Sequence, residues 1–410
     1  MPGSPTPTAL VILVALFVAM PIVAFASRRL RIPYTVTLVL VGLAFSALPF
    51  RGELGVSPGL AVAVLLPGLV FEAAYRLDGD ELRRTFGGVA LLAIPGVLIS
   101  AGVVTVVLHL ATGLPLDEAF LVGAMVSATD PVAVVATMRR LRAPRRLVTL
   151  VDAESLFNDG TGILVFTIAL ATFGGGTTLG EGVVTFITGL AVSVLIGAIA
   201  GFAIARLAAV TDDHLIELTF TLLAAYGTYL VADLFHESGI IATVVAGIVL
   251  GTYGRRVGLS ARAQESIDVV WEFLAFVLTA VVFLLIGVAI PIDTVASAAV
   301  PIAWGVFAVL VGRAVVVYGL LGGTARLVHR VGLGPGLPIG WLHVMNWAGL
   351  RGAVAMALAL SLPETVPDRT LLQGITFGIV LFTVIVQGTT AGRVVAWAGV
   401  TTGEAEESTA

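Results

Sequence analysis

Apolar and polar positions alternate along the chain on the scale of whole segments, with long apolar runs separated by short polar loops. A run of about 20 apolar residues forms a helix long enough to cross the hydrocarbon core of a bilayer. Thirteen such runs lie at residues 7–26, 33–49, 58–75, 86–110, 117–138, 147–172, 181–207, 214–236, 239–253, 269–291, 297–321, 338–361 and 370–396. The pattern predicts an all-α polytopic membrane protein with about thirteen transmembrane helices, of which the second and ninth have the least sharply marked ends.

The composition agrees with this class. Of the 410 residues, 58% are hydrophobic and only 12% are charged, whereas a soluble protein of this length needs more charge to cover its surface. Cysteine is absent, which excludes disulfides, cysteine-ligated zinc and thiol catalysis. The net charge is −4 and no long basic patch is present, so a nucleic-acid partner is not expected.

The arginines test the number of spans. Seventeen fall in alternate loops, whereas the opposite loops carry only Arg51 and Arg369. Positively charged residues accumulate in cytoplasmic loops, and one missed or invented span would destroy this asymmetry. The seventeen are Arg28, Arg29, Arg31, Arg76, Arg83, Arg84, Arg139, Arg140, Arg142, Arg145, Arg146, Arg206, Arg255, Arg256, Arg262, Arg326 and Arg330. We therefore expect the N-terminus outside and the C-terminus in the cytoplasm, with the arginine-rich loop at 139–146 near anionic lipid headgroups.

The first run is expected to stay in the protein, because arginines follow it, whereas in a signal peptide they precede the apolar segment. The spans then divide into six, one linker and six more, which starts the second half on the opposite membrane face. This number and order of spans is typical of two repeats with inverted membrane topology. We expect residues 1–396 to form one transporter unit, with the first repeat at about 7–172, the linker helix at 181–207 and the second repeat at 214–396. Residues 397–410 are predicted to form a short cytoplasmic tail.

Two spans at matching positions of the repeats are interrupted. The fifth contains "SATDPVAVV", with a proline directly after an aspartate, and the twelfth contains "NWAGLRGAVAMAL", with glycines flanking Arg351. Broken helices are tolerated at membrane depth only where they line a cavity or are buried in protein. Paired breaks indicate a transport site. We expect Asp130 to cap a half-helix that begins at Pro131, leaving the carbonyl of Thr129 free.

The sixth span contains "DAESLFNDGTGILVF", and ionisable residues inside a membrane helix are functional candidates. Helical spacing places Ser155 and Asp159 on one face. Together with Asp130 and the Thr129 carbonyl, they supply hard oxygen ligands for a small alkali cation. Repulsion between the carboxylates and their burial favour protonation, so protons compete with the cation for the same oxygens. Such a site, in a protein that alternates its access, predicts an exchanger.

Other polar residues of these spans have different expected roles. Glu154 and Asn158 face about 100° away from Ser155 and Asp159 on the helix. Glu154 is expected to form a structural ion pair with Arg313 of the eleventh span or, failing that, with Arg351. We expect Asn158 to hydrogen-bond the broken backbone or to orient a carboxylate. Glu72, near the cytoplasmic end of the third span, is either an outer ligand of the ion or a carboxylate that reaches the membrane surface.

Four motifs, in order, resemble those of the NhaP/NHE-type sodium/proton antiporters: "SATDPVAV", "AESLFNDGTGILVF", "SGIIATVVAGIVLG" and "WAGLRGAVAMALAL". The resemblance runs from about residue 10 to 396. It implies thirteen spans in inverted six-helix repeats. It also implies an interleaved core domain and dimerisation domain, and broken fifth and twelfth helices that cross at the ion site. A homodimer in the plasma membrane is the implied assembly.

The resemblance also assigns residues. Asp159 matches the family's essential ion-binding aspartate, whereas Asp130, Ser155 and the Thr129 carbonyl match its co-ligands. Glu72 matches a carboxylate that lies near the site in some members. The family's glutamate–arginine pair corresponds to Glu154 and Arg313. An asparagine before the essential aspartate, here Asn158, resembles the electroneutral exchangers and implies one sodium for each proton.

The main hypothesis is therefore secondary antiport of Na⁺ or Li⁺ against H⁺, with no cofactor and no metal other than the transported ion. K⁺/H⁺ antiport at the same site stays open, because the ligand types are identical. An intramembrane aspartyl protease or lipid phosphotransferase is disfavoured, since "GxGD" is absent and "DGTGIL" breaks the DGxxAR pattern, so we expect no enzyme. A channel would differ by conductance in place of saturable, proton-coupled flux.

Overall fold

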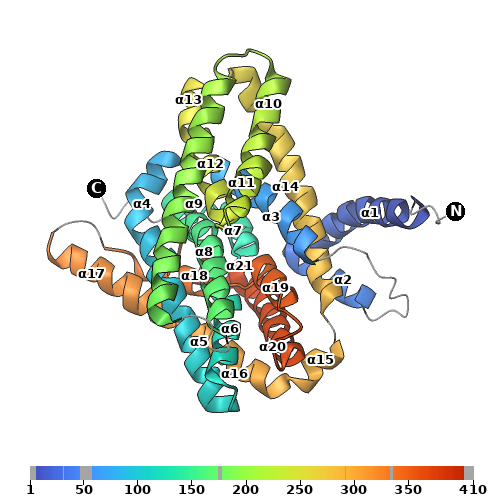
Figure 1. The fold of residues 1–410 in the computed structure, drawn as a ribbon, viewed down its shortest axis with the longest axis vertical. Helices are drawn as coiled ribbons and strands as arrows, with labels where there is room; N and C mark the ends of the chain where they lie inside the picture. Colours follow the sequence, from blue (N-terminus) through green and yellow to red (C-terminus); the bar gives the residue numbers. More distant parts are fainter. Residues whose placement is uncertain are drawn as a thin grey trace.

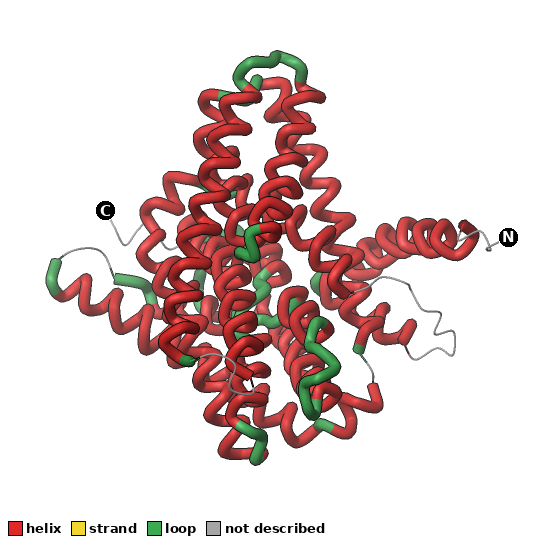
Figure 2. The backbone as a smooth tube through the Cα atoms, viewed as in Figure 1, coloured by secondary structure: helices red, strands yellow, loops and turns green. Residues whose placement is uncertain are grey.

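The computed structural model describes residues 6–30, 32–46, 58–173, 178–290, 292–332 and 336–400. These residues form helices joined by short loops, and no strand occurs among them (Figures 1 and 2). Within hydrocarbon, backbone polar groups have no water to bond, and a helix satisfies them within one segment. The predicted all-α class is confirmed.

The first half of the chain, up to the predicted linker, contains ten helical elements. They are α1 (Thr6–Leu30), α2 (Tyr34–Ser46), α3 (Pro58–Tyr75), α4 (Gly79–Leu91), η1 (Leu92–Gly96), α5 (Val97–Thr112), α6 (Leu116–Met125), α7 (Val132–Arg140), α8 (Arg145–Thr172) and α9 (Leu179–Ala208). The η elements, here and below, are π-helical turns inside longer helices. Thus α4, η1 and α5 run as one span from Gly79 to Thr112.

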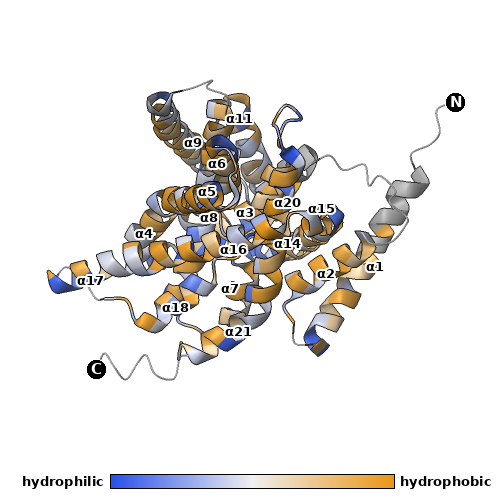
Figure 3. Cartoon of the chain, turned by 90° about the horizontal axis from the view of Figure 1, so that it is seen from below, coloured by the Kyte–Doolittle hydropathy of each residue, from blue (hydrophilic) through white to orange (hydrophobic). Residues whose placement is uncertain are grey.

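The second half of the chain also consists of α-helices interrupted by π-helical turns. Its elements are α10 (His214–Leu222), η3 (Leu223–Gly227), α11 (Thr228–Leu234), α12 (Gly239–Val249), η4 (Leu250–Gly254), α13 (Arg255–Val257), α14 (Ala261–Ala289), α15 (Ile292–Ser297), α16 (Ala299–Ala314), η5 (Val315–Leu321), α17 (Gly322–Arg330), α18 (Ile339–Trp347), α19 (Ala353–Leu360), α20 (Arg369–Phe382), η6 (Thr383–Gln387) and α21 (Gly388–Trp397). Most of the helical ribbon is hydrophobic, and several hydrophilic stretches lie at helix ends (Figure 3). Many large hydrophobic side chains are exposed, among them Phe25, Leu110 and Trp397.

Eight helices of the described residues are long and apolar enough to cross a membrane, or nine if the bent pair of α1 and α2 counts as one span. Each of the thirteen predicted runs coincides with a helix or with a pair of helices. The five outside the eight coincide with α1, α2, α3, the pair α6–α7 and the pair α18–α19. Because these five are not among the eight, the number thirteen stays a prediction.

The helices pack in two groups. In one, α14 packs on α2 and α3, and α12 packs on α3 and α9. In the other, α5 packs on α6 and α16, α8 packs on α4 and α6, and α20 packs on α16 and α19. The long helix α8 also contacts α3, α9 and α12, and so links the groups. The two interrupted pairs, α6–α7 and α18–α19, belong to the second group, which matches the predicted core domain; the division into core and dimerisation domains stays a prediction.

Glycines let α2 and α14 approach each other closely. A Cβ atom added at Gly42 would lie 2.3 Å from the carbonyl oxygen of Leu284, and one at Gly287 would lie 2.2 Å from that of Val39. Small residues at helix contacts are the usual means by which membrane helices bring their backbones together. This contact fixes α2 beside α14, and Tyr34 at the start of α2 stacks on Phe276 of α14 with ring centroids 5.3 Å apart.

The G287A variant should therefore lose stability. The added methyl group meets backbone atoms that cannot rotate away, so we expect a loss of about 1–3 kcal/mol, visible as a lower thermal-unfolding midpoint in detergent. The G102A variant is the matched control, because nothing lies within 4 Å of a Cβ atom there. Equal unfolding midpoints for the two variants would contradict the close packing of α2 on α14.

Candidate functional site

The two interrupted spans meet at their breaks. Helix α6 ends at Met125 and α7 begins at Val132, whereas α18 ends at Trp347 and α19 begins at Ala353. The backbone N–H of Asp130 donates to the carbonyl oxygen of Leu350 at 2.8 Å. The non-helical segments of the fifth and twelfth predicted spans are thus joined by a backbone hydrogen bond, as the crossing predicts.

The carboxylate of Asp130 lies at the start of two half-helices. Its Oδ1 accepts from the N–H of Val132 at 3.3 Å, and its Oδ2 accepts from the N–H of Ala353 at 3.4 Å. Helix N-termini carry unsatisfied N–H groups and partial positive charge, so both stabilise this anion. The expected capping is present, although the helix begins one residue after Pro131. Gly352 permits this approach, because a Cβ atom there would lie 2.0 Å from Oδ2.

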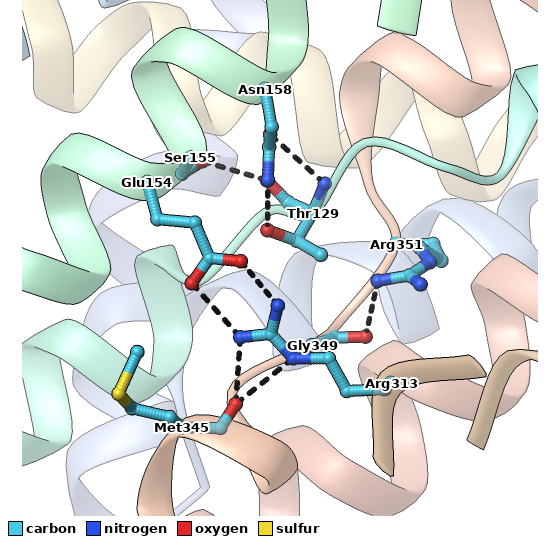
Figure 4. Close-up of polar contacts among 8 residues, drawn as sticks. All are labelled: Thr129, Glu154, Ser155, Asn158, Arg313, Met345, Gly349 and Arg351. Carbon is cyan, nitrogen blue, oxygen red and sulfur yellow. Dashed lines mark hydrogen bonds and ion pairs between the residues drawn. The ribbon is translucent and has the colours of Figure 1, made fainter. Parts of the chain in front are cut away.

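Helix α8 satisfies the other backbone groups at the first break (Figure 4). The Ser155 hydroxyl donates to the Thr129 carbonyl at 2.7 Å. The N–H of Thr129 donates to Asn158 Oδ1 at 3.2 Å, and Asn158 Nδ2 donates to Thr129 Oγ1 at 2.7 Å. Asn158 therefore makes the expected contact with the broken backbone. The expectation that the Thr129 carbonyl is free is wrong, because Ser155 occupies one of its two lone pairs.

A cavity of about 500 Å³ reaches this region. Four of the five predicted cation- and proton-binding residues line it, namely Asp130, Ser155, Asp159 and Glu72. The fifth, Thr129, is 4% exposed and is not among the lining residues. Apolar and aromatic side chains, among them Leu66, Val70, Tyr34 and Phe276, form much of the remaining wall.

Charges elsewhere on the cavity wall are paired. Arg76 Nε lies 2.7 Å from Glu72 Oε1, and Arg76 also contacts Glu272 at 3.5 Å. Arg139 Nη2 lies 2.6 Å from Asp152 Oδ2. In contrast, neither Asp130 nor Asp159 has a cationic partner among the described residues. Two carboxylates that share a cavity without a counter-charge are suited to hold a proton or a metal cation.

Glu154 and Arg313 form a buried ion pair on another side of α8 (Figure 4). Arg313 donates to both carboxylate oxygens, one of them through Nη2 at 3.0 Å. Its Nε and Nη2 also donate to the Met345 carbonyl at 3.1 and 2.8 Å. The guanidinium thus satisfies a carbonyl in the last turn of α18, where cations are favoured. The expected contact is present, and its role in stability stays a prediction.

Arg351 is not the partner of Glu154. Its side chain is fully buried, and its Nη1 donates to the Gly349 carbonyl at 2.8 Å (Figure 4). Among the described residues it has no acidic partner. This second guanidinium therefore satisfies one carbonyl within the break of the twelfth span.

Three contacts of the site were not predicted. Arg76 pairs with Glu72, and their i, i+4 spacing on one helix was a readable signal. Arg139 pairs with Asp152 across the arginine-rich loop. The N–H of Arg351 donates to Thr383 Oγ1 at 3.0 Å, and nothing local in the sequence indicates that contact.

Comparison with known proteins identifies the family. The profile of the family described as "Sodium/hydrogen exchanger, transmembrane" matches residues 12–397. The chain belongs to this family. It is therefore a membrane transporter and not an enzyme, and the resemblance to NhaP-type antiporters is confirmed.

Two relatives share sequence similarity with nearly the whole of this chain. The Na(+)/H(+) antiporter ApNhaP of Aphanothece halophytica is 38% identical over 374 residues, which cover 89% of this chain and 69% of the relative. The Na(+)/H(+) antiporter NhaH of Halobacillus dabanensis is 33% identical, over 92% of this chain and 95% of its own.

A solved structure has the same fold. The sodium proton antiporter MjNhaP1 from Methanocaldococcus jannaschii superposes with a TM-score of 0.73, at 19% identity, over 95% of this chain and 98% of its own. At this identity the similarity concerns the fold alone.

Removing one partner of the buried Glu154–Arg313 ion pair should lower the stability of the protein more than replacing a charged residue on the surface. The E154Q variant leaves the Arg313 guanidinium buried without a counter-charge, which costs about 3–5 kcal/mol. Thermal unfolding in detergent should show a much lower midpoint, and the double variant E154Q/R313M should recover part of the loss. An E154Q protein with normal stability and no transport would contradict the structural role of the pair.

Proposed function

We propose that this exchanger transports Na⁺ or Li⁺ in one direction and H⁺ in the other by alternating access, with both ions competing for Asp159 and Asp130. The observation that carries the proposal is the pair of carboxylates that line one cavity without a cationic partner among the described residues. In the low-dielectric interior of a membrane protein, such a pair requires a cation or a proton to be stable.

The ligands for the cation are hard oxygens. Asp159 and Asp130 provide carboxylate oxygens, and Ser155 provides a hydroxyl whose proton already goes to Thr129. Because that proton points to the carbonyl, the hydroxyl lone pairs stay available for a cation. The second lone pair of the Thr129 carbonyl is a further ligand. Together these oxygens replace part of the hydration shell of a small alkali cation.

A proton and a cation exclude each other at these oxygens. Binding of one Na⁺ offsets one of the two negative charges and displaces one proton, whereas protonation removes the charge that holds Na⁺. Each ion therefore leaves when the other arrives. Asn158 adds no charge to the site, because its amide is neutral, and it bonds to the backbone and hydroxyl of Thr129. This supports exchange of one sodium for one proton.

The path from the site runs along the cavity toward Arg76 and Arg139. Both belong to the arginine-rich loops that the positive-inside rule assigns to the cytoplasm, so the cavity is proposed to open to that side. Movement of the helix group that contains both breaks against the group of α3, α9, α12 and α14, by an elevator-like or rocking motion, would open the other side. A homodimer in the plasma membrane is proposed by family likeness.

K⁺/H⁺ exchange at the same site is the alternative. The ligand types do not separate the two cations, because selectivity depends on cavity dimensions of a fraction of an ångström. Sodium is preferred here since the relatives described above are named as Na(+)/H(+) antiporters.

Replacing Asp159 should abolish exchange and leave the protein folded. We expect D159N proteoliposomes to show no cation-induced collapse of a proton gradient when sodium, lithium or potassium is added, because an amide neither binds a proton nor attracts the cation. The E272Q variant is the control, since Glu272 lines the same cavity but its side chain is 74% exposed. Retained flux in D159N would contradict the site, and a wild-type response to potassium alone would change the substrate.

The same assay tests electroneutrality. Sodium-driven collapse of the proton gradient should be equal whether the membrane potential is clamped at zero or left free. A rate that changes with the membrane potential would contradict one-for-one exchange.

Competition also sets the pH dependence. As pH falls, protons occupy more of the carboxylate oxygens, so the apparent affinity for Na⁺ should fall while the maximal rate changes little. Initial rates measured against sodium concentration at several pH values would show this. An affinity that is flat between about pH 6 and 8 would mean that the proton and cation sites are separate.

A further inference from the structure

The helix formed by α20, η6 and α21 runs past the break in the twelfth span and contacts both sides of it. Thr390 Oγ1 accepts from the indole N–H of Trp347, the last residue of α18, at 2.9 Å. Thr383 Oγ1 accepts from the backbone N–H of Arg351, inside the break, at 3.0 Å. Both hydroxyls accept from residues 347–351, so the two threonines face the interrupted span.

Thr383 satisfies a backbone group that the break leaves without a helical partner. The side chain is fully buried, and the nearer acceptor for its own proton is the Val380 carbonyl at 3.1 Å, whereas the Arg351 carbonyl lies at 3.5 Å. With its proton directed into its own helix, the hydroxyl presents a lone pair to the N–H of Arg351. Thr383 is also the first residue of the π-helical turn η6, and such turns are frequent at functional sites.

The peptides next to Arg351 contact the proposed ion site. The Leu350 carbonyl accepts from the N–H of Asp130 at 2.8 Å, and the N–H of Ala353 donates to the Asp130 carboxylate at 3.4 Å. Between them, Gly352 leaves no room for a Cβ atom. Residues 350–353 therefore lie between Asp130 on one side and Thr383 on the other.

We propose that Thr383 is a positioning residue for ion exchange, whose hydroxyl fixes residues 350–353 so that the N-terminus of α19 points at Asp130. This inference rests on the proposed function, because the position of Asp130 matters to transport only if Asp130 binds the ions. Thr383 has no contact with the cavity, and it acts only through the backbone that it holds.

Loss of the Thr383 hydroxyl would weaken the electrostatic stabilisation of the Asp130 carboxylate. The N–H of Arg351 would be buried without an acceptor, and the segment would turn to find another one. The N–H of Ala353 would then be aligned less well with Asp130, and the ionised carboxylate would lose part of its stabilisation. Protons would therefore compete more strongly, so sodium would bind less tightly and half-maximal exchange would require a higher pH.

The experiment compares T383V, T383S and T376V with the wild-type protein in proteoliposomes, by titrating sodium at several pH values. Valine keeps the shape of threonine without the hydroxyl, whereas serine keeps the hydroxyl. Thr376 is the matched control, because it is equally buried on the same helix. Its hydroxyl donates to Leu372 within that helix at 3.0 Å, and its contact with Met125 Sδ, at 4.0 Å, is with a weak sulfur acceptor and not with the backbone of residues 350–353.

For T383V we expect the apparent affinity for sodium to fall roughly tenfold. This is the effect of weakening one hydrogen bond to a charged group, here the bond from the Ala353 N–H to the Asp130 carboxylate. The pH of half-maximal rate should move upward in this variant. T383S and T376V should stay within about twofold of the wild-type affinity.

Wild-type affinity and pH dependence in T383V would overturn the inference, even if its unfolding midpoint were lower, because a purely structural threonine would change stability alone. Should T383V not fold, T383C replaces it, since a thiol is a weak acceptor of nearly the same volume. Its apparent sodium affinity should be lower than those of T383S and the wild type, and a wild-type affinity in T383C would overturn the inference. A wild-type protein without sodium-driven proton flux would overturn the proposed function as well. Flux in the wild type with no change in T383V would overturn this inference alone.

Discussion

A backbone polar group without a partner costs several kcal/mol in hydrocarbon, and two interrupted helices create a whole set of such groups in one place. The arrangement of the core follows from that requirement. Asp130 accepts from the N–H groups that begin α7 and α19, Ser155 and Asn158 bond to Thr129, and Arg313 donates to the end of α18. Two of these side chains, Asp130 and Ser155, also line the cavity of the proposed ion site.

Charge is distributed unevenly around these breaks. Glu154 is neutralised by Arg313 in the interior, and Glu72 and Asp152 are each neutralised by an arginine on the cavity wall. Asp130 and Asp159 alone among these acids have no such partner in the described part of the chain. Helix α8 carries Glu154 of the ion pair and Asp159 of the unpartnered carboxylates on different faces, and so joins the structural ion pair to the cavity.

Much of this site could be predicted from local patterns. Pro131 and the glycines around Arg351 indicated the two breaks, and helical spacing placed Ser155 with Asp159 and separated them from Glu154. Contacts between distant segments could not be read in this way. The bond from Ala353 to Asp130 spans 223 positions, and the bonds from Ser155 to Thr129 and from Arg351 to Thr383 depend on how separate helices are placed side by side. The 13-residue helix α2 is too short for its span to be counted from length alone.

The unpartnered carboxylates also bear on the tightness of coupling. A transporter that could return with an empty site would dissipate the sodium gradient without moving protons. Here an empty site would carry two bare negative charges through the low-dielectric middle of the protein, at a cost of several kcal/mol per ion. A site filled by a cation or by a proton would carry less charge and cross more easily. No lysine or arginine pairs with Asp130 or Asp159 within the described ranges, and this would act as a safeguard against slippage, because a built-in counter-ion would let the vacant carrier return.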